Sequence, residues 1–91
     1  MPYSLVYSET SHRLIQNLHP DLKSIIRARL KKIANNPYEG KQLVKELSGY
    51  FSSRAKRYRI IYKIEEENQI VQIYYVGHRK DIYQLFKENR F

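Results

Sequence analysis

The chain contains no cysteine among its 91 residues. It therefore cannot form a disulfide, use a thiolate as a nucleophile or bind a metal through cysteine. The three histidines, His12, His19 and His78, lack the spacing of metal ligands. We accordingly expect no metal and no cofactor, because a chain of this length buries one modest core and has little room for a cofactor cleft.

Long apolar runs are also missing. No stretch approaches the roughly 20 apolar residues that cross a bilayer, and residues 1–9, MPYSLVYSE, lack the apolar segment of a signal peptide. We therefore expect a cytoplasmic protein without a membrane partner.

Acidic residues are scarce. The chain has 17 Lys and Arg and 9 Asp and Glu, which gives a formal net charge of +8 and a pI near 9.8. A charge of this sign attracts anions, so nucleic acid is the leading class of partner.

The N-terminal half predicts a strand and a helical hairpin. Residues 3–8, YSLVYS, alternate with the two-residue period of a strand. Ser8 can cap a helix over residues 9–18, where apolar side chains recur at helical spacing. A second helix begins at Pro20 and carries an apolar stripe up to the sequence NNP at residues 35–37, where the proline ends it.

The C-terminal half predicts three strands, at about residues 50–54, 58–65 and 69–76, and a short helix at about residues 81–89. Short turns between the strands favour antiparallel pairing. The fold class is therefore α+β: a small antiparallel β-sheet packed against an N-terminal α-helical hairpin, in the order β-α-α-β-β-β with a short C-terminal helix. We expect one domain over residues 1–91.

The middle strand predicts that the sheet has two different faces. By the two-residue period one face receives Tyr58, Ile60, Tyr62 and Ile64, and the other receives Arg57, Arg59, Ile61 and Lys63. One face is expected to be apolar and the other mainly basic.

Residues 54–63, RAKRYRIIYK, hold five cations and no acid. Such a run is either a solvated surface or an RNA-binding surface, and the cations that would bind RNA are Arg54, Lys56, Arg57 and Lys63. Three aromatic residues lie in or near this run: Tyr50, Phe51 and Tyr58. Their rings either stack on bases or belong to the core.

The sequence VGHRKDIY, residues 76–83, gathers side chains that can act on a phosphodiester. Cleavage of RNA by its own 2′-hydroxyl needs a base, cations for the phosphate and an acid for the leaving oxygen, and it needs no metal. His78 can exchange a proton near neutral pH, Arg59 and Arg79 can hold phosphate oxygens, and Tyr83 can stack on a base or move a proton. Alternatively, His78 is an ordinary surface residue, Arg79 pairs with Asp81 or Glu88, and Tyr83 closes the core.

The order of elements, with LSGYFSSRAKRYRIIYKI at residues 47–64 and VGHRKDIY near the end, resembles the RelE toxin family of bacterial and archaeal toxin-antitoxin systems. The resemblance covers nearly the whole chain and implies a single RelE-like toxin domain. It implies an endoribonuclease that cuts mRNA in the ribosomal A site and so inhibits translation. The implied partners are mRNA, the ribosome with its 16S rRNA, and a cognate antitoxin through which alone the toxin reaches operator DNA.

The resemblance also implies roles for single residues. Arg59 matches the arginine placed at the scissile phosphate, Arg79 a phosphate-stabilising arginine, and Tyr83 a tyrosine that stacks on or activates the nucleotide. His78 occupies a position that is often basic in the family. A lysine pair on the preceding strand is missing, because its places fall on Ser52 and Arg54, or on Tyr50 and Ser52. Then either His78 is the base, or charge comes from Arg54, Lys56 or Lys63.

Two other functions fit the same resemblance. The related ParE branch shares the fold and inhibits DNA gyrase by binding it, which needs no acid or base. A catalytically degenerate member would bind only its antitoxin and, with it, operator DNA, and Ser52 is the residue that favours this alternative.

Overall fold

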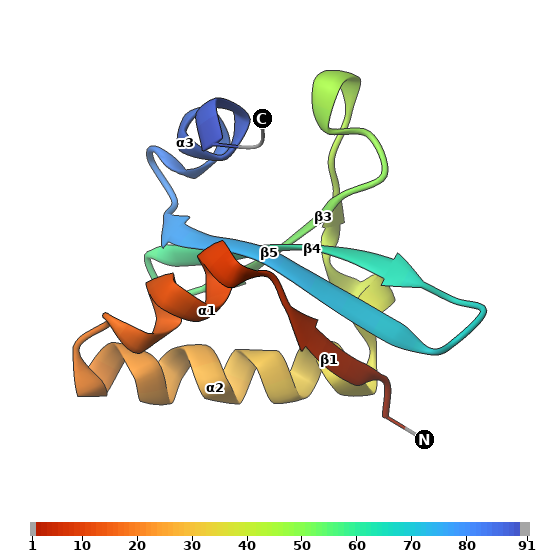
Figure 1. Cartoon of the computed structure of the whole chain (residues 1–91), viewed down its shortest axis with the longest axis horizontal. Coiled ribbons are helices and arrows are strands. Elements are labelled where there is room, and N and C mark those ends of the chain that lie inside the picture. The colour runs from red at the N-terminus through yellow and green to blue at the C-terminus, as the bar shows by residue number, and fades with distance from the viewer. Residues whose placement is uncertain (1, 90–91) are drawn as a thin grey trace.

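The predicted strands and helices are all present in the computed structural model, which describes residues 2–89 (Figure 1). Their ends differ from the predicted ones by at most two residues. In chain order the elements are β1 (Ser4–Tyr7), α1 (Glu9–Gln16), α2 (Pro20–Asn35), the 3-10 helix η1 (Pro37–Glu39), β2 (Lys41–Gln42), the 3-10 helix η2 (Lys45–Leu47), β3 (Phe51–Ala55), β4 (Tyr58–Glu65), β5 (Ile70–His78) and α3 (Ile82–Asn89). The α+β class is confirmed.

The five strands form one sheet in the order β1-β5-β4-β3-β2. The pairs β2–β3, β3–β4 and β4–β5 are antiparallel, as predicted for β3, β4 and β5. β1 pairs parallel with β5, so the prediction of an antiparallel sheet is wrong at this edge. Short turns force antiparallel pairing only on consecutive strands, and every other strand lies between β1 and β5 in the sequence. β2 was not predicted, because two residues are too few to show a period.

Local signals set the ends of the first two helices. The Ser8 hydroxyl accepts a hydrogen bond from the Ser11 N–H at 3.0 Å and caps α1, as predicted. Pro20 lies in the first turn of α2, where its missing N–H costs nothing, and α2 ends at Asn35, two residues before Pro37. Within residues 2–89 no helix is long and apolar enough to cross a membrane.

The sheet has a core on each face. Figure 1 shows α1 and α2 on one face and α3 on the other. On the first face Ile26, Leu30 and Ile33 of α2 pack against fully buried side chains of β4 and β5, among them Ile60 and Tyr62. Each such side chain contributes about 1.5–3 kcal/mol relative to its exposed state, so this core holds the hairpin on the sheet.

The second core corrects the prediction of a mainly basic face. Ile61 is fully buried there, and Tyr75 of β5 and Ile82 and Phe86 of α3 pack with it in one cluster. A β-bulge enlarges this core: Ile61 pairs with Tyr75 and Tyr62 with Ile73, so Tyr74 is an extra residue and packs on the same side as Tyr75. The sheet face that carries α3 is therefore apolar around Ile61, with Arg59 and Lys63 on either side of it along β4.

The aromatic rings near the basic run belong to the cores. Phe51 is buried and stacks on Tyr62 with ring centroids 5.6 Å apart, and Tyr58 is half-buried against the first core. Tyr50 meets Phe86 edge to face at 5.1 Å. These rings are not free platforms for bases, which decides between the two readings of the aromatic residues.

A buried tyrosine ties the sheet to the segment that follows α2. The Tyr62 hydroxyl donates a hydrogen bond of 2.6 Å to the Pro37 carbonyl, and burial raises the pKa of Tyr62 to about 12. Gly40 lies directly against this hydroxyl: a Cβ on Gly40 would come within 2.1 Å of it. Because its φ is −68°, Gly40 is needed for space and not for backbone conformation.

We predict that Gly40→Ala lowers the free energy of unfolding by about 1–3 kcal/mol, because the new methyl group must displace the Tyr62 hydroxyl from Pro37. Tyr62→Phe removes the hydroxyl itself and costs about 1 kcal/mol. In the Tyr62→Phe background Gly40→Ala should cost distinctly less than alone, because the obstructing oxygen is gone. Urea denaturation of the four proteins measures this coupling, and strictly additive costs would contradict the steric explanation.

Candidate functional site

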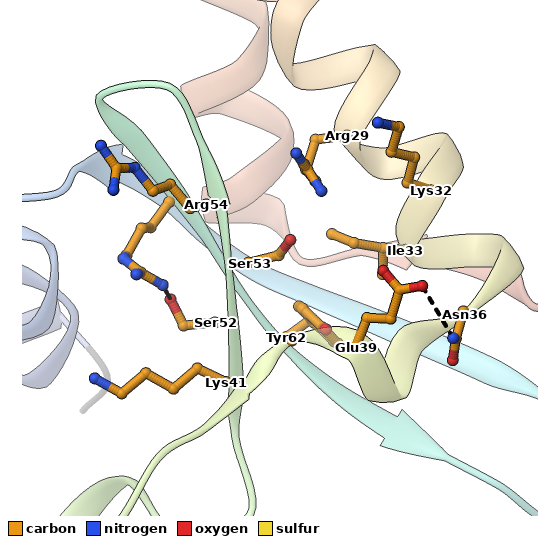
Figure 2. A pocket seen from close by; sticks show the side chains of 12 residues that line it. Arg29, Lys32, Ile33, Asn36, Glu39, Lys41, Ser52, Ser53, Arg54 and Tyr62 are labelled. Atoms are coloured by element: carbon orange, nitrogen blue, oxygen red, sulfur yellow. Dashed lines mark hydrogen bonds between the residues drawn. The ribbon is translucent and has the colours of Figure 1, made fainter.

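A hollow of about 280 Å³ opens at the edge of the sheet between α2, β2 and β3 (Figure 2). We call it the basic hollow, because five of its lining side chains are cationic and one, Glu39, is acidic. It is lined by Arg29, Lys32, Ile33, Asn36, Glu39, Gly40, Lys41, Ser52, Ser53, Arg54, Arg59 and Tyr62. A site of this composition attracts a polyanion.

Ser52 is the centre of one side of the hollow. Its side chain is buried, and its hydroxyl accepts hydrogen bonds from Arg59 Nη1 at 3.0 Å and from the Tyr83 hydroxyl at 3.2 Å. The structure thus brings together two predicted site residues, Arg59 of β4 and Tyr83 of α3. The hydroxyl fixes a guanidinium and a phenol next to each other on the α3 face.

Two further cations lie beside this group. Lys41 is opposite Ser52 in the β2–β3 pair, and Arg54 is opposite Arg59 in the β3–β4 pair. Directly paired residues share a face, so both side chains lie on the α3 face with Arg59. Arg54 Nε also donates to the Lys56 carbonyl at 2.9 Å, which holds it at the turn. Lys41 supplies a lysine where β3 has Ser52, and sequence reasoning missed it because β2 was not predicted.

His78 lies apart from Arg59 and Tyr83. It pairs with Tyr58 across β4 and β5, and the two rings are 5.7 Å apart on the face that α2 covers. Gly77, one residue earlier, is opposite Arg59. Since successive residues of a strand point to opposite faces, the sheet separates His78 from Arg59. Its Nδ1 accepts the Lys80 N–H at 3.2 Å, which leaves Nε2 for other contacts.

The other predicted cations lie around the ends of the strands. Lys56 and Arg57 form the exposed turn between β3 and β4, and the Arg57 carbonyl accepts the Arg79 N–H at 2.8 Å. Arg79 is exposed and forms no ion pair with Asp81 or Glu88 within residues 2–89. The Lys63 ammonium lies 4.6 Å from the centre of the Tyr50 ring, at the opposite end of β4 from Arg59.

The site is thus a group of cations beside one phenol, with Arg59 and Arg54 held by hydrogen bonds. Arg59, Lys41 and Arg54 can neutralise a phosphate, and Tyr83 offers a hydroxyl or a ring next to them. Tyr62 also lines the hollow; burial raises its pKa to about 12, and its hydroxyl donates to the Pro37 carbonyl. In residues 2–89 no three His, Asp or Glu side chains gather as metal ligands would.

Known proteins with this arrangement of elements include solved toxins. The crystal structure of the toxin-antitoxin complex RelBE2 from Mycobacterium tuberculosis contains a chain with a TM-score of 0.79 and 32% identity, over 87% of this chain and 100% of that one. The isolated Escherichia coli RelE toxin superposes with a TM-score of 0.72 over 98% of this chain and 99% of that one. Its identity of 17% shows a common fold alone.

Sequence comparison leads to the same group. Toxin RelG of Mycobacterium tuberculosis is 36% identical over 92% of this chain and 99% of its own length, and Toxin RelE of that organism is 28% identical over 92% and 89%. The family model described as ParE toxin of type II toxin-antitoxin system, parDE, matches residues 3–83. The chain therefore belongs to this toxin family, within the RelE/ParE superfamily of type II toxin-antitoxin systems.

Proposed function

We propose that this toxin is a ribosome-dependent endoribonuclease that inhibits translation by cutting mRNA. The observation that carries the proposal is the pair of hydrogen bonds by which the buried Ser52 hydroxyl holds Arg59 and Tyr83 together. The names of the curated relatives, Toxin RelG and Toxin RelE, support it.

The proposed reaction is attack of a ribose 2′-hydroxyl on the adjacent phosphate, which breaks the bond from phosphorus to the 5′-oxygen of the next nucleotide and leaves a 2′,3′-cyclic phosphate. The attacking hydroxyl gives up its proton, and the leaving 5′-oxygen takes one up. The phosphate gains charge in the transition state, and the fixed guanidinium of Arg59, with Lys41 and Arg54 beside it, stabilises that charge. Tyr83 stacks on the nucleotide or moves a proton at the same phosphate. Arg79, Lys56 and Arg57, exposed at the turn ends, bind flanking RNA by charge.

A chain of 91 residues has little room for a deep cleft that aligns an RNA strand, and in this proposal the ribosome supplies that alignment in the A site. Holding reactants in the reactive geometry is worth several kcal/mol of the barrier, so a small protein can limit its own contribution to charge and proton transfer. In this proposal mRNA and 16S rRNA are the partners during cleavage, in the cytoplasm.

An antitoxin is the other partner. The similar chains from Mycobacterium tuberculosis and Escherichia coli were solved in toxin-antitoxin complexes, and we propose that a cognate antitoxin likewise covers this toxin. Through that antitoxin alone the toxin would reach operator DNA.

A second candidate function is inhibition of DNA gyrase by binding. The description of the matching family model, ParE toxin, favours it. Binding to gyrase requires no cleavage chemistry at Ser52, Arg59 and Tyr83, so the two functions differ in what mutation of these residues does to RNA.

We predict that Arg59→Ala lowers the rate of mRNA cleavage by about 10² or more, since it removes a fixed charge from the phosphate. Tyr83→Phe keeps the ring and removes the hydroxyl, so it separates the two proposed roles of Tyr83. If Tyr83 acts by stacking, cleavage persists; if Tyr83 moves a proton, cleavage falls by at least tenfold or so. The measurement is primer extension on mRNA after induction without antitoxin. Arg27→Ala, an exposed arginine on α2 outside the basic hollow, is the matched control.

Growth arrest without new mRNA ends, undiminished by Arg59→Ala, would contradict the nuclease and favour the gyrase inhibitor. A gyrase supercoiling assay with the purified toxin would then identify the target.

We predict that His78→Gln changes the cleavage rate by no more than about twofold, because the sheet separates His78 from Arg59 and Tyr83. Loss of a general base costs roughly 10² to 10⁴ in rate. Single-turnover cleavage on programmed ribosomes between pH 6 and 8 measures both the rate and its pH dependence. A fall of about 10² or more in the rate would restore His78 as a candidate for the base.

A further inference from the structure

We infer that Arg29 and Lys32 of α2 form a second phosphate site, which holds the RNA strand next to the phosphate at Arg59. The inference rests on the proposed function in that it takes RNA as the ligand. It goes beyond that function because it adds a subsite on the other side of the sheet edge and a path for the strand.

The first support is the position of the two side chains. Arg29 and Lys32 are three residues apart on one face of α2, and both line the basic hollow. Figure 2 shows Arg29 and Lys32 on one side of β3, with Lys41 and Arg54 on the other. Ser52 and Ser53 alternate in the same way, so the hollow extends over both sides of the strand.

The second support is the free edge of β3. β2 pairs only with Phe51 and Ser52, and beyond them Ser53, Arg54 and Ala55 form the open edge of the sheet. A strand of RNA can pass over this edge from Arg59 to Arg29, where a longer β2 would block it. One phosphate then lies at Arg59 and the neighbouring one at Arg29 and Lys32.

A second hollow, of about 240 Å³, continues the path. It is lined by Ile25, Ala28, Arg29, Lys32, Ala55 and Lys56. Arg29 and Lys32 line both hollows, so they lie where the two meet. Lys56 at the far end provides the next cation along the edge, which fits a chain molecule with regularly repeated charges better than a single small anion.

The third support is charge. Within residues 2–89 the ion pairs are His19 with Asp21 and Lys87 with Glu46, so neither includes a cation of the basic hollow. The one acid in the hollow, Glu39, accepts a hydrogen bond from Asn36 Nδ2 at 3.1 Å. Five cations near one carboxylate leave an excess of positive charge, and a bound polyanion compensates it.

The test compares two non-cleavable RNA oligonucleotides, a dinucleotide with one phosphodiester and a tetranucleotide with three. We expect the double variant Arg29→Ala with Lys32→Ala to weaken tetranucleotide binding about tenfold, because a charge-assisted contact is lost. The same variant should weaken dinucleotide binding less than twofold or so. The slope of log affinity against log salt should fall by about 0.7 for the tetranucleotide, one phosphate contact on a single strand. Glu39→Gln should tighten tetranucleotide binding by about threefold, because it removes a repelling charge and keeps an acceptor for Asn36.

The matched control is Lys23→Ala with Lys31→Ala, the same loss of two charges on the same helix, outside both hollows. An equal loss of affinity in this control, or an equal loss for the dinucleotide, overturns the second site. A toxin that cuts mRNA on the ribosome, but whose Arg29 Nε–H NMR signal does not shift with the tetranucleotide, also overturns it and leaves the proposed function standing. If the parent cuts no mRNA and binds neither oligonucleotide, both proposals fail.

Discussion

The register of β3 against β4 is the constraint on which the rest of the molecule depends. It places Ser52 opposite Ile61 and Arg54 opposite Arg59, so one face receives a buried apolar residue and the cations together. A slip of one residue would bring Ile61 and Arg59 to the face of the helical hairpin and expose Ile60 and Tyr62. Burial on both faces therefore fixes the position of the cations as firmly as it fixes the cores.

Helices pack on both faces of the sheet, and this determines where the cations lie. The helical hairpin covers one face. On the other face, Ile82 and Phe86 of α3 cover the part around Ile61 and Tyr75. The remaining surface is the β3 edge and the end of the α3 face beside it, where Lys41, Arg54 and Arg59 lie together. Like charges so close repel one another and oppose folding, a cost that an anionic partner removes.

The sequence predicted what repeats with a clear period and missed what depends on pairing between distant segments. The alternation in β4 and the Ser8 cap were readable, because they depend on neighbours in the chain. β2 is too short to show a period, and with it the position of Lys41 was hidden. The bulge at Tyr74 changes which residues share a face, and the local sequence pattern does not predict it.

The same reasoning explains the mixed outcome for the predicted site. Arg59 and Tyr83, two of the predicted site residues, lie together, and the residue that joins them, Ser52, entered the sequence analysis as a position where a lysine is missing. His78 was grouped with Arg59 and Tyr83 because all three can act on a phosphodiester. Gly77 is the partner of Arg59, so strand parity places His78, one residue later, on the opposite face from Arg59.

The parallel pairing of β1 with β5 has a consequence for synthesis of the protein. Ser4 pairs with Ile70 and Tyr7 with Ile73, so the first strand to be translated finds its neighbour only when the last strand has left the ribosome. Contacts so far apart in sequence form late and slow the folding of a small domain. Tyr83 is translated later still, and Ser52 and Arg59 lack it until then. A nascent chain thus has no complete site, which leaves time for a partner to meet the toxin as it finishes folding.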